Sequence, residues 1–429
     1  MSIKTNRRAF VQGLSAATAG AGLLAASGAG SAKAAGPSGP PIRIGAPLSA
    51  TGPFASDGEV SKIGHQMAID EINAMGGLYG RKLELVTYDI ADLSPDKIKA
   101  GFTYLTSEGK ADVLITQTLF TPGPEMEVCA ASGVPLLHSS AVHDFSELVK
   151  TKPDKYWMVF MIAPWEYAHG DGLLPALETF QRMSDWKPRD KSIAMITTNS
   201  SYSNAIEQAI RKSLPKYGWK IVVADTIVPP FTEWGGILAK IRQANPDMIF
   251  TTDYQVGDLA AFQNQFMQNP TKSVMYGQWA PSLNEYINLT KENSTGVIYG
   301  DLVGILNDEI AQGFYERFKK AAPDVDPGGS TSGTMYDAVY LYANAVLWAG
   351  GPEDRKKVAH YLRTNIYRGV CGAYKFRPDY QDLPAYPDMV DDSSIGLPHL
   401  WAQIWEGKRN IIAPQPYAKT PFRLPPWFS

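Results

Sequence analysis

The sequence contains few of the residues that build metal and disulfide sites. It has two cysteines, Cys129 and Cys371, and six histidines among 429 residues. The cysteines do not lie in a CxxC or other metal-ligand spacing, and no two histidines are four residues apart, so we expect no metal site. In an oxidising compartment the two cysteines could form one disulfide, and the sequence alone leaves this pairing open.

Catalytic and cofactor motifs are also missing. There is no G-x-S-x-G nucleophile motif, no H-E-x-x-H zinc motif and no G-x-x-x-x-G-K-[ST] phosphate loop. The glycines of residues 76–80 follow a predicted helix, which is typical of a helix stop rather than of a dinucleotide loop. Ser139 and Ser140 lie between His138 and His143, but adjacent strand-end residues point in different directions and give no triad geometry. We therefore expect no cofactor and no enzyme; an exported hydrolase remains an alternative.

Neither sign of charge dominates, and long apolar runs are scarce. The chain carries 40 basic and 43 acidic residues, a net charge of −3, with both signs spread along its length. Such a chain offers no basic face to attract nucleic acid. After residue 35 no stretch approaches the roughly 20 consecutive apolar residues of a membrane-spanning helix. We therefore expect a soluble monomer that binds no nucleic acid.

The first residues have the pattern of an export signal. Arg7 and Arg8 precede Phe10, a weakly hydrophobic stretch of Ala, Gly and Leu follows, and Ala32-Lys33-Ala34 resembles a small-residue cleavage site. The arginine pair and the diluted apolar stretch favour a twin-arginine signal over residues 1–34, followed by a linker at residues 35–41. Cleavage would remove four basic residues and no acids, leaving 36 basic and 43 acidic residues, a net charge of −7. We expect the mature protein in the periplasm.

From residue 42 the pattern alternates between strands and helices. Strands are predicted at 42–45, 83–88, 113–116 and 134–137, and again at 192–197, 220–226, 248–251 and 273–277, with helices between them. This predicts an α/β fold of two Rossmann-like lobes with parallel sheets. Lobe one is expected at 42–163 with a return segment at 297–395, in which helices 308–321 and 331–349 cover the first sheet. Lobe two is expected at 164–296 with a C-terminal segment at 396–429.

Two segments carry a resemblance to a known family. They are residues 44–58, IGAPLSATGPFASDG, and residues 68–81, AIDEINAMGGLYGR. With shorter matches at Ser132-Gly133-Val134-Pro135, Gly296-Val297 and Tyr336-Asp337-Ala338-Val339, they resemble the leucine/isoleucine/valine-binding protein family, the extracytoplasmic solute receptors of ABC importers. The resemblance covers roughly residues 42–376. It implies a type I periplasmic binding fold, in which three strands join the lobes, and an inner-membrane ABC permease as partner.

The resemblance also implies which residues hold the solute. The loops after the early strands of lobe one and the strand ends of lobe two would supply them, with one residue from the returning helix. By position these are Asp57, Thr118, Phe120, Thr121, Ser140, Ala141, Val142, Tyr202, Tyr254, Trp279 and Tyr336. Phe54 is a further candidate for an aromatic wall. Asp57 could equally be the N-cap of the first helix, since it lies just before the helix predicted at residues 59–75.

Three positions depart from the family members that bind amino acids. Leu119 stands where the carboxylate-binding serine is expected, Val142 replaces a threonine, and Trp279 replaces the lobe-two acid that faces the ammonium group. A buried ammonium without an anionic partner is costly, so a zwitterion would bind poorly unless Asp57 supplies the charge. We expect a small organic solute, either hydrophobic and amino-acid-like or an aromatic or aliphatic carboxylate or amide. A sensory ligand-binding module is the other alternative.

Overall fold

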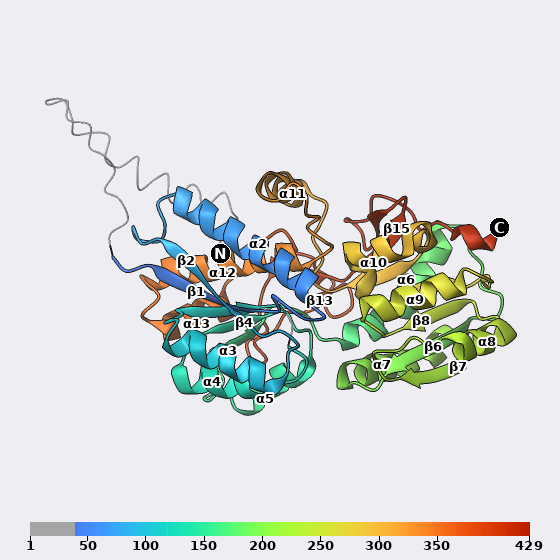
Figure 1. The fold of residues 1–429 in the computed structure, drawn as a ribbon, viewed down its shortest axis with the longest axis horizontal. Helices are drawn as coiled ribbons and strands as arrows, with labels where there is room; N and C mark the ends of the chain where they lie inside the picture. Colours follow the sequence, from blue (N-terminus) through green and yellow to red (C-terminus); the bar gives the residue numbers. More distant parts are fainter. Residues whose placement is uncertain (1–38, 118) are drawn as a thin grey trace, which may run out of the picture.

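The computed structural model describes residues 39–117 and 119–429, and two lobes lie side by side in it (Figure 1). The predicted export signal and Thr118 lie outside the described residues. Among the helices of the described part, none combines the length and the apolar character needed to cross a bilayer.

The first lobe is built on a five-stranded parallel sheet in the order β2-β1-β3-β4-β5. One core, which includes β1, β3 and α2, covers one face of this sheet, and a second core beside α3 and α4 covers the other. The elements are β1 (Ile42–Leu48), α2 (Ala55–Ala74), β2 (Leu83–Asp89), α3 (Pro95–Ser107), β3 (Val113–Thr116), α4 (Pro124–Ser132), β4 (Leu136–His138), α5 (His143–Thr151) and β5 (Val159–Met161).

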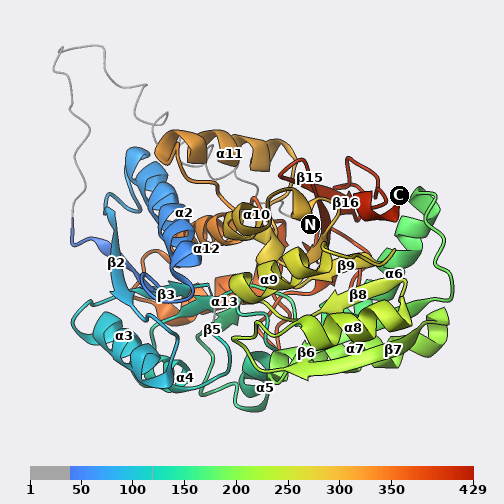
Figure 2. The same cartoon turned by 45° about the vertical axis from the view of Figure 1, so that its right-hand side comes forward.

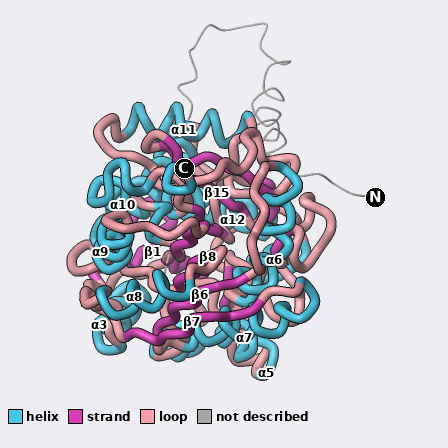
Figure 3. The backbone as a smooth tube through the Cα atoms, turned by 90° about the vertical axis from the view of Figure 1, so that its right-hand side faces the viewer, coloured by secondary structure: helices cyan, strands magenta, loops and turns pink. Residues whose placement is uncertain are grey.

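The second lobe is built on a seven-stranded sheet in the order β16-β15-β10-β9-β8-β6-β7. Figure 3 shows its strands between α6 and α7 on one side and α8, α9 and α10 on the other. The elements are α6 (Tyr167–Met183), β6 (Ser192–Thr198), α7 (Ser201–Tyr217), β7 (Lys220–Ile227), α8 (Gly235–Ala244), β8 (Met248–Thr251), α9 (Val256–Phe266), β9 (Val274–Gly277), α10 (Asn284–Thr290), β10 (Ile298–Asp301), β15 (Leu400–Trp405) and β16 (Lys408–Ala413).

The returning segment begins later than the sequence pattern suggests. Residue 297 was the expected start of the return to lobe one, but β10 pairs in parallel with β9 and antiparallel with β15 in the second sheet. Residues 298–301 therefore belong to lobe two, and the chain crosses to lobe one only after Asp301. Crossings also follow β5 and precede β15, so three segments join the lobes.

The rest of the return lies on the first lobe. It comprises α11 (Glu309–Ala321), α12 (Thr331–Ala349), α13 (Arg355–Thr364) and the short strands β11 (Tyr367–Arg368), β12 (Ala373–Tyr374), β13 (Ala385–Tyr386) and β14 (Leu397–Pro398). Helix α12 packs on α2 within the first core. The irregular stretch after residue 378 extends the open edge of that sheet, where Met161 N donates to Gln381 O at 2.8 Å.

Local signals explain several boundaries. Helix α2 ends before Gly76 and Gly77, which adopt φ values of 101° and 74° that glycine tolerates best. Helix α7 begins after Ser200, whose hydroxyl accepts a hydrogen bond from Ser203 N.

Both cysteines are buried and unpaired, so the disulfide that the sequence left open is not formed.

Candidate functional site

A cavity of about 260 Å³ lies between the lobes, at the carboxyl ends of strands from both sheets. Loops at this edge of parallel sheets are where ligands bind in open α/β folds. The first lobe contributes Phe54, Phe120, Thr121, Ser139, Ser140, Ala141 and Val142; the second contributes His169, Ser200, Ser201, Tyr202, Tyr254, Gln278, Trp279, Gly300 and Asp301; the chain between β10 and the start of α12 contributes Leu302, Val303, Ser330 and Thr331.

Aromatic rings span the gap between the lobes. Phe120 of the first lobe stacks on Tyr254 of the second, with ring centroids 5.6 Å apart, and Phe54 lies 5.5 Å from Phe120 on the other side. Phe120 follows β3 and Tyr254 follows β8, so the stack exists only while the lobes are in this arrangement. These rings form an apolar wall that would suit a hydrophobic or aromatic solute.

Trp279 lines the cavity from a strained turn. Its φ and ψ are 52° and −50°, and Ala280 N donates to Gln278 O at 2.6 Å, so Trp279 is the central residue of a γ-turn with positive φ. A bulky residue rarely occupies this region, and such strain clusters where a side chain must be held for function. The turn fixes the half-buried indole at the end of β9.

A chain of uncharged hydrogen-bonding groups forms the lobe-two wall. Gln278 Nε2 donates to Tyr202 Oη at 2.9 Å and lies 3.0 Å from His169 Nε2, while Tyr276 Oη donates to Gln278 Oε1 at 2.5 Å. Burial lowers the pKa of His169 well below its usual value and raises the pKa of Tyr202 well above its own. Both side chains are therefore neutral at pH 7, and this wall offers hydrogen bonds rather than charge.

The Ser140 hydroxyl is held inside the lobe-one wall. Ser140 Oγ accepts a hydrogen bond from Leu119 N at 3.0 Å and lies 2.9 Å from His138 Nδ1. Burial lowers the pKa of His138 to about 3, and within the described residues no hydrogen-bond partner reaches its Nε2. A serine–histidine pair without an orienting acid lacks the third member of a hydrolase triad. Leu119 itself is buried in the core beside α3 and α4.

Comparisons with known proteins give the family. Residues 41–385 match the model of the periplasmic binding protein family. The chain belongs to this family. It is a solute-binding receptor of an ABC importer.

Two relatives illustrate how far the similarity extends. The leucine-, isoleucine-, valine-, threonine- and alanine-binding protein of Pseudomonas aeruginosa is 24% identical over 339 residues, which are 78% of this chain and 85% of that protein. The crystal structure of a putative branched-chain amino acid ABC transporter from Silicibacter pomeroyi is 35% identical, with a TM-score of 0.84, and covers 90% of this chain and 100% of that one.

The fold is shared more widely than the sequence. A branched-chain amino acid transporter substrate-binding protein from Streptococcus pneumoniae, solved in complex with isoleucine, has a TM-score of 0.71 at 21% identity and covers 87% of this chain and 100% of that one. The receptor therefore has the two-lobe architecture that the resemblance implied.

Most of the residues predicted for the site line the cavity of the receptor. Phe120, Thr121, Ser140, Ala141, Val142, Tyr202, Tyr254 and Trp279 all do so, and so does Phe54. They share one property: each lies just after the carboxyl end of a strand, on the loop that leads into the next helix or, for Tyr202, in the first turn of that helix. Their contact with a solute stays a prediction.

Two predicted residues lie elsewhere. Asp57 is 2% exposed and accepts a hydrogen bond from Gln117 Nε2 at 2.8 Å; it neither lines the cavity nor caps α2, whose N-cap is Phe54. Burial is the main reason that its pKa rises to about 6. Tyr336 is fully buried in the first core and donates to Glu71 Oε2 at 2.5 Å, because α12 turns this face toward α2. Placing Tyr336 at the cleft was wrong.

Eleven of the lining residues were not predicted, and His169, Gln278 and Asp301 are the ones with the most hydrogen-bonding capacity. Asp301 ends β10, is 7% exposed, and accepts a hydrogen bond from Val303 N at 3.0 Å through Oδ1. Burial raises its pKa. The acid in the cavity wall is therefore Asp301, at the end of β10. In the family members that bind amino acids, the acid was expected at the position that Trp279 occupies here. Gln278 directly precedes Trp279 at a predicted strand end, and this position could have predicted that it lines the cavity.

Within the part of the chain that the structure describes, no group of three or more His, Cys, Asp or Glu side chains is arranged to hold a metal ion. Among the described residues that line the cavity, none is lysine or arginine. A solute carboxylate would therefore have to be held by hydroxyls and backbone N–H groups.

Proposed function

We propose that the receptor captures a small organic solute in the interlobe cavity, with a hydrophobic, amino-acid-like solute as the first candidate. Aromatic or aliphatic carboxylates and amides are the other members of this class. The observation that carries the proposal is a cavity of about 260 Å³ to which both lobes contribute, with aromatic rings on one side and neutral polar groups on the other. The Pseudomonas aeruginosa relative is named for five amino acids, which supports the same class.

Capture follows from hinged closure of the lobes. A solute that touches Phe120 and Ser140 on one side and Trp279 on the other gains its full set of contacts only in the closed arrangement. Binding energy then shifts the population toward that arrangement. The Phe120–Tyr254 stack adds to closure, since it too requires both lobes. No bond in the solute is broken, consistent with the incomplete Ser140–His138 pair.

The polar end of the solute has two candidate anchors. Thr121 lines the cavity with a hydroxyl, whereas the Ser139 hydroxyl already donates to Gln117 O at 2.8 Å, and the loop at Ala141 adopts a φ of 50°, which turns its backbone away from extended geometry. The Thr121 hydroxyl and the backbone of this loop would hold a carboxylate or an amide oxygen. Asp301 is the acid in the wall, and burial raises its pKa, so its carboxyl group would offer an ammonium or amide nitrogen a hydrogen-bond acceptor rather than a full negative charge.

The receptor would deliver its solute to a permease in the inner membrane as a monomer in the periplasm, after export through a twin-arginine signal at residues 1–34. The support is the arginine pair in the sequence and the ABC-transporter relatives. Neither nucleic-acid binding nor sensory signalling is needed to explain the cavity.

A thermal-shift screen of the mature chain tests the ligand class. Branched-chain and aromatic amino acids, benzoate, short aliphatic acids and amides would be added singly; a ligand at 100 times its Kd stabilises the folded state by about 2.7 kcal/mol. Hits would be confirmed by calorimetry and by small-angle scattering, with the solute recovered and checked by mass. A screen in which no member of the class shifts Tm, or a hit recovered as hydrolysis products, would reject the proposal.

A further inference from the structure

A second cavity, of about 470 Å³, lies between the lobes on the other side of the segment that joins them. Tyr315 of α11 and the loop at residues 326–329 line it from the first lobe. Strands β15 and β16 line it from the second lobe. In Figures 1 and 2, α11 and β15 both lie along the upper side of the molecule. Asp301 is the one described residue that lines both this cavity and the interlobe cavity above.

The carboxyl group of Asp301 is oriented toward the second cavity. A Cβ added to Gly329, which lines only the second cavity, would lie 3.5 Å from Asp301 Oδ2 and 3.3 Å from Tyr299 Oη. Asp301 Oδ2 has no hydrogen-bond partner within the described residues. The inner end of the second cavity therefore presents a buried carboxyl group and a tyrosine hydroxyl close to one glycine.

The outer end of the second cavity is cationic. Lys408, Arg409 and Lys419 line it, against the acids Asp326 and Asp301. Arg409 Nη1 lies 3.3 Å from Asp326 Oδ1 and Nη2 donates to Asn284, while its buried Nε has no partner among the described residues. Burial favours the neutral form of Asp301. Three cations then face one or two anions, so the cavity has a net positive charge.

The cationic residues come from a segment that the family model does not reach. The match ends at residue 385, whereas Lys408, Arg409 and Lys419 lie in and after β16. The C-terminal part of the chain therefore supplies the cations of this cavity, while residues 299–329, within the match, supply most of the rest of its lining.

We propose that the second cavity is a binding site for a small organic carboxylate, which Arg409 and Lys408 hold by charge-assisted hydrogen bonds while its uncharged end reaches Tyr299 and Asp301. A carboxylate supplies the acceptors that Arg409 Nε lacks, and a second carboxyl group, when protonated, can share a hydrogen bond with Asp301. An occupant in this position touches both lobes.

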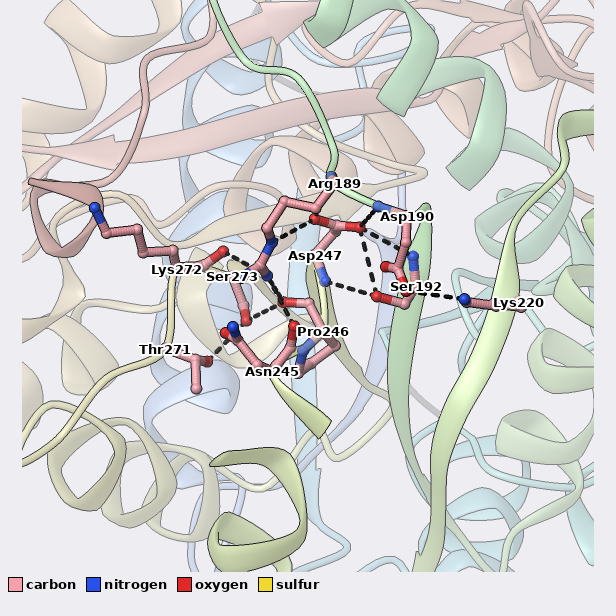
Figure 4. A network of polar contacts seen from close by, with 10 residues as sticks. All are labelled: Arg189, Asp190, Ser192, Lys220, Asn245, Pro246, Asp247, Thr271, Lys272 and Ser273. Atoms are coloured by element: carbon pink, nitrogen blue, oxygen red, sulfur yellow. Dashed lines mark hydrogen bonds and ion pairs between the residues drawn. The ribbon is translucent and has the colours of Figure 1, made fainter. Parts of the chain in front are cut away.

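Calorimetric titration of the mature receptor with succinate, against sodium chloride of equal ionic strength, tests this site. We expect saturable binding that weakens about tenfold or more in Arg409→Gln and severalfold in Lys408→Gln. Lys272→Gln is the matched control, since Lys272 lies next to Ser273 just before β9 (Figure 4), does not line the second cavity and changes the net charge equally. Circular dichroism checks that Arg409→Gln is folded. If Arg409→Gln does not fold, Lys408→Gln still tests the site.

The variant Trp279→Ala shows which of the two cavities binds succinate. If it binds in the second cavity, its affinity is unchanged by Trp279→Ala, whereas the interlobe solute binds at least about fivefold more weakly. Equal weakening by Lys272→Gln and Lys408→Gln, loss of succinate binding in Trp279→Ala, or no binding up to about 10 mM would each overturn the proposal. The interlobe solute is measured in a separate titration, so failure of the second site leaves the interlobe proposal standing.

Discussion

The two edges of the second-lobe sheet differ in how their polar groups are used. At the amino edge, Asp247 precedes β8 and accepts hydrogen bonds from Arg189 N at 2.7 Å, Asp190 N at 3.0 Å and Ser192 N at 3.2 Å (Figure 4). Arg189 Nε adds an ion pair at 3.1 Å. Each Asp247 oxygen is thereby satisfied, and one carboxylate ties the starts of two neighbouring strands to the preceding loop.

At the carboxyl edge the corresponding groups are not satisfied. Asp253, which follows β8, has one oxygen without a partner, and so has Asp301 after β10, within the described residues. Trp279 after β9 occupies a strained turn. Unpaired polar atoms and strain cost folding free energy, and they are tolerated where a ligand or a motion uses them. The amino edge stabilises the lobe, and the carboxyl edge is available for binding.

Removing the charge at Asp247 should give the largest effect on stability. Asp247→Asn leaves the Arg189 guanidinium and several backbone N–H groups with a weaker acceptor, so we expect the free energy of unfolding to fall by about 3 kcal/mol. Denaturant unfolding measures it. Solute affinity of the folded protein should be unchanged, because Asp247 lies at the opposite edge from the cavity. Asp253→Asn is the matched control at the carboxyl edge, and equal destabilisation by both variants would remove the contrast.

Asp253 should instead make stability depend on pH. Burial raises the pKa of its carboxyl to about 7 from an ordinary value of 3.8. The folded state therefore keeps the proton that the unfolded state releases, so this contribution is fully present below pH 4 and is lost as the pH rises to 7. We expect wild type to lose about 2 kcal/mol more than Asp253→Asn over that range. Unfolding curves at pH 4, 5.5 and 7 measure the difference. Parallel pH profiles for the two proteins would contradict the prediction.

Trp279 should separate binding from strain. Trp279→Ala removes the ring, and we expect solute affinity to fall by at least about 1 kcal/mol, or roughly fivefold, in calorimetry. Trp279→Gly removes the same ring but also relieves the positive φ, so it should be more stable than Trp279→Ala by about 1 kcal/mol. An affinity unchanged in both variants would show that the cavity is not the solute site, and equal stabilities would show that the turn carries no strain.

The contrast between the edges also explains which residues could be predicted from the sequence. Strand–helix alternation predicts where parallel strands end, and Phe120, Ser140, Tyr202 and Trp279, which the family resemblance indicated by their positions near those ends, line the cavity. Asp301 was missed because β10 joins the second sheet through pairing with β9 and β15, and β15 lies about a hundred residues away along the chain. Pairing at that distance leaves no local pattern.

The direction of side chains on a buried helix could not be predicted from the sequence either. Helix α12 was predicted at its observed bounds, yet it is buried on nearly all sides, so its sequence shows no apolar face against a polar one. Tyr336 therefore could not be assigned to the core or the cleft from periodicity. His169 lies on a helix after the first crossing, and only the tertiary fold brings it beside Gln278.

Ser200 is an exception to the difference between the two edges, because it lines the cavity and also stabilises a helix. Its hydroxyl accepts a hydrogen bond from Ser203 N at 3.1 Å and caps α7. We expect Ser200→Ala to lower the free energy of unfolding by about 1 kcal/mol, with solute affinity unchanged. Ser201→Ala is the control, because the exposed Ser201 lies inside the helix and has no capping role. If Ser200→Ala lowers solute affinity and leaves the free energy of unfolding unchanged, the Ser200 hydroxyl serves binding rather than stability.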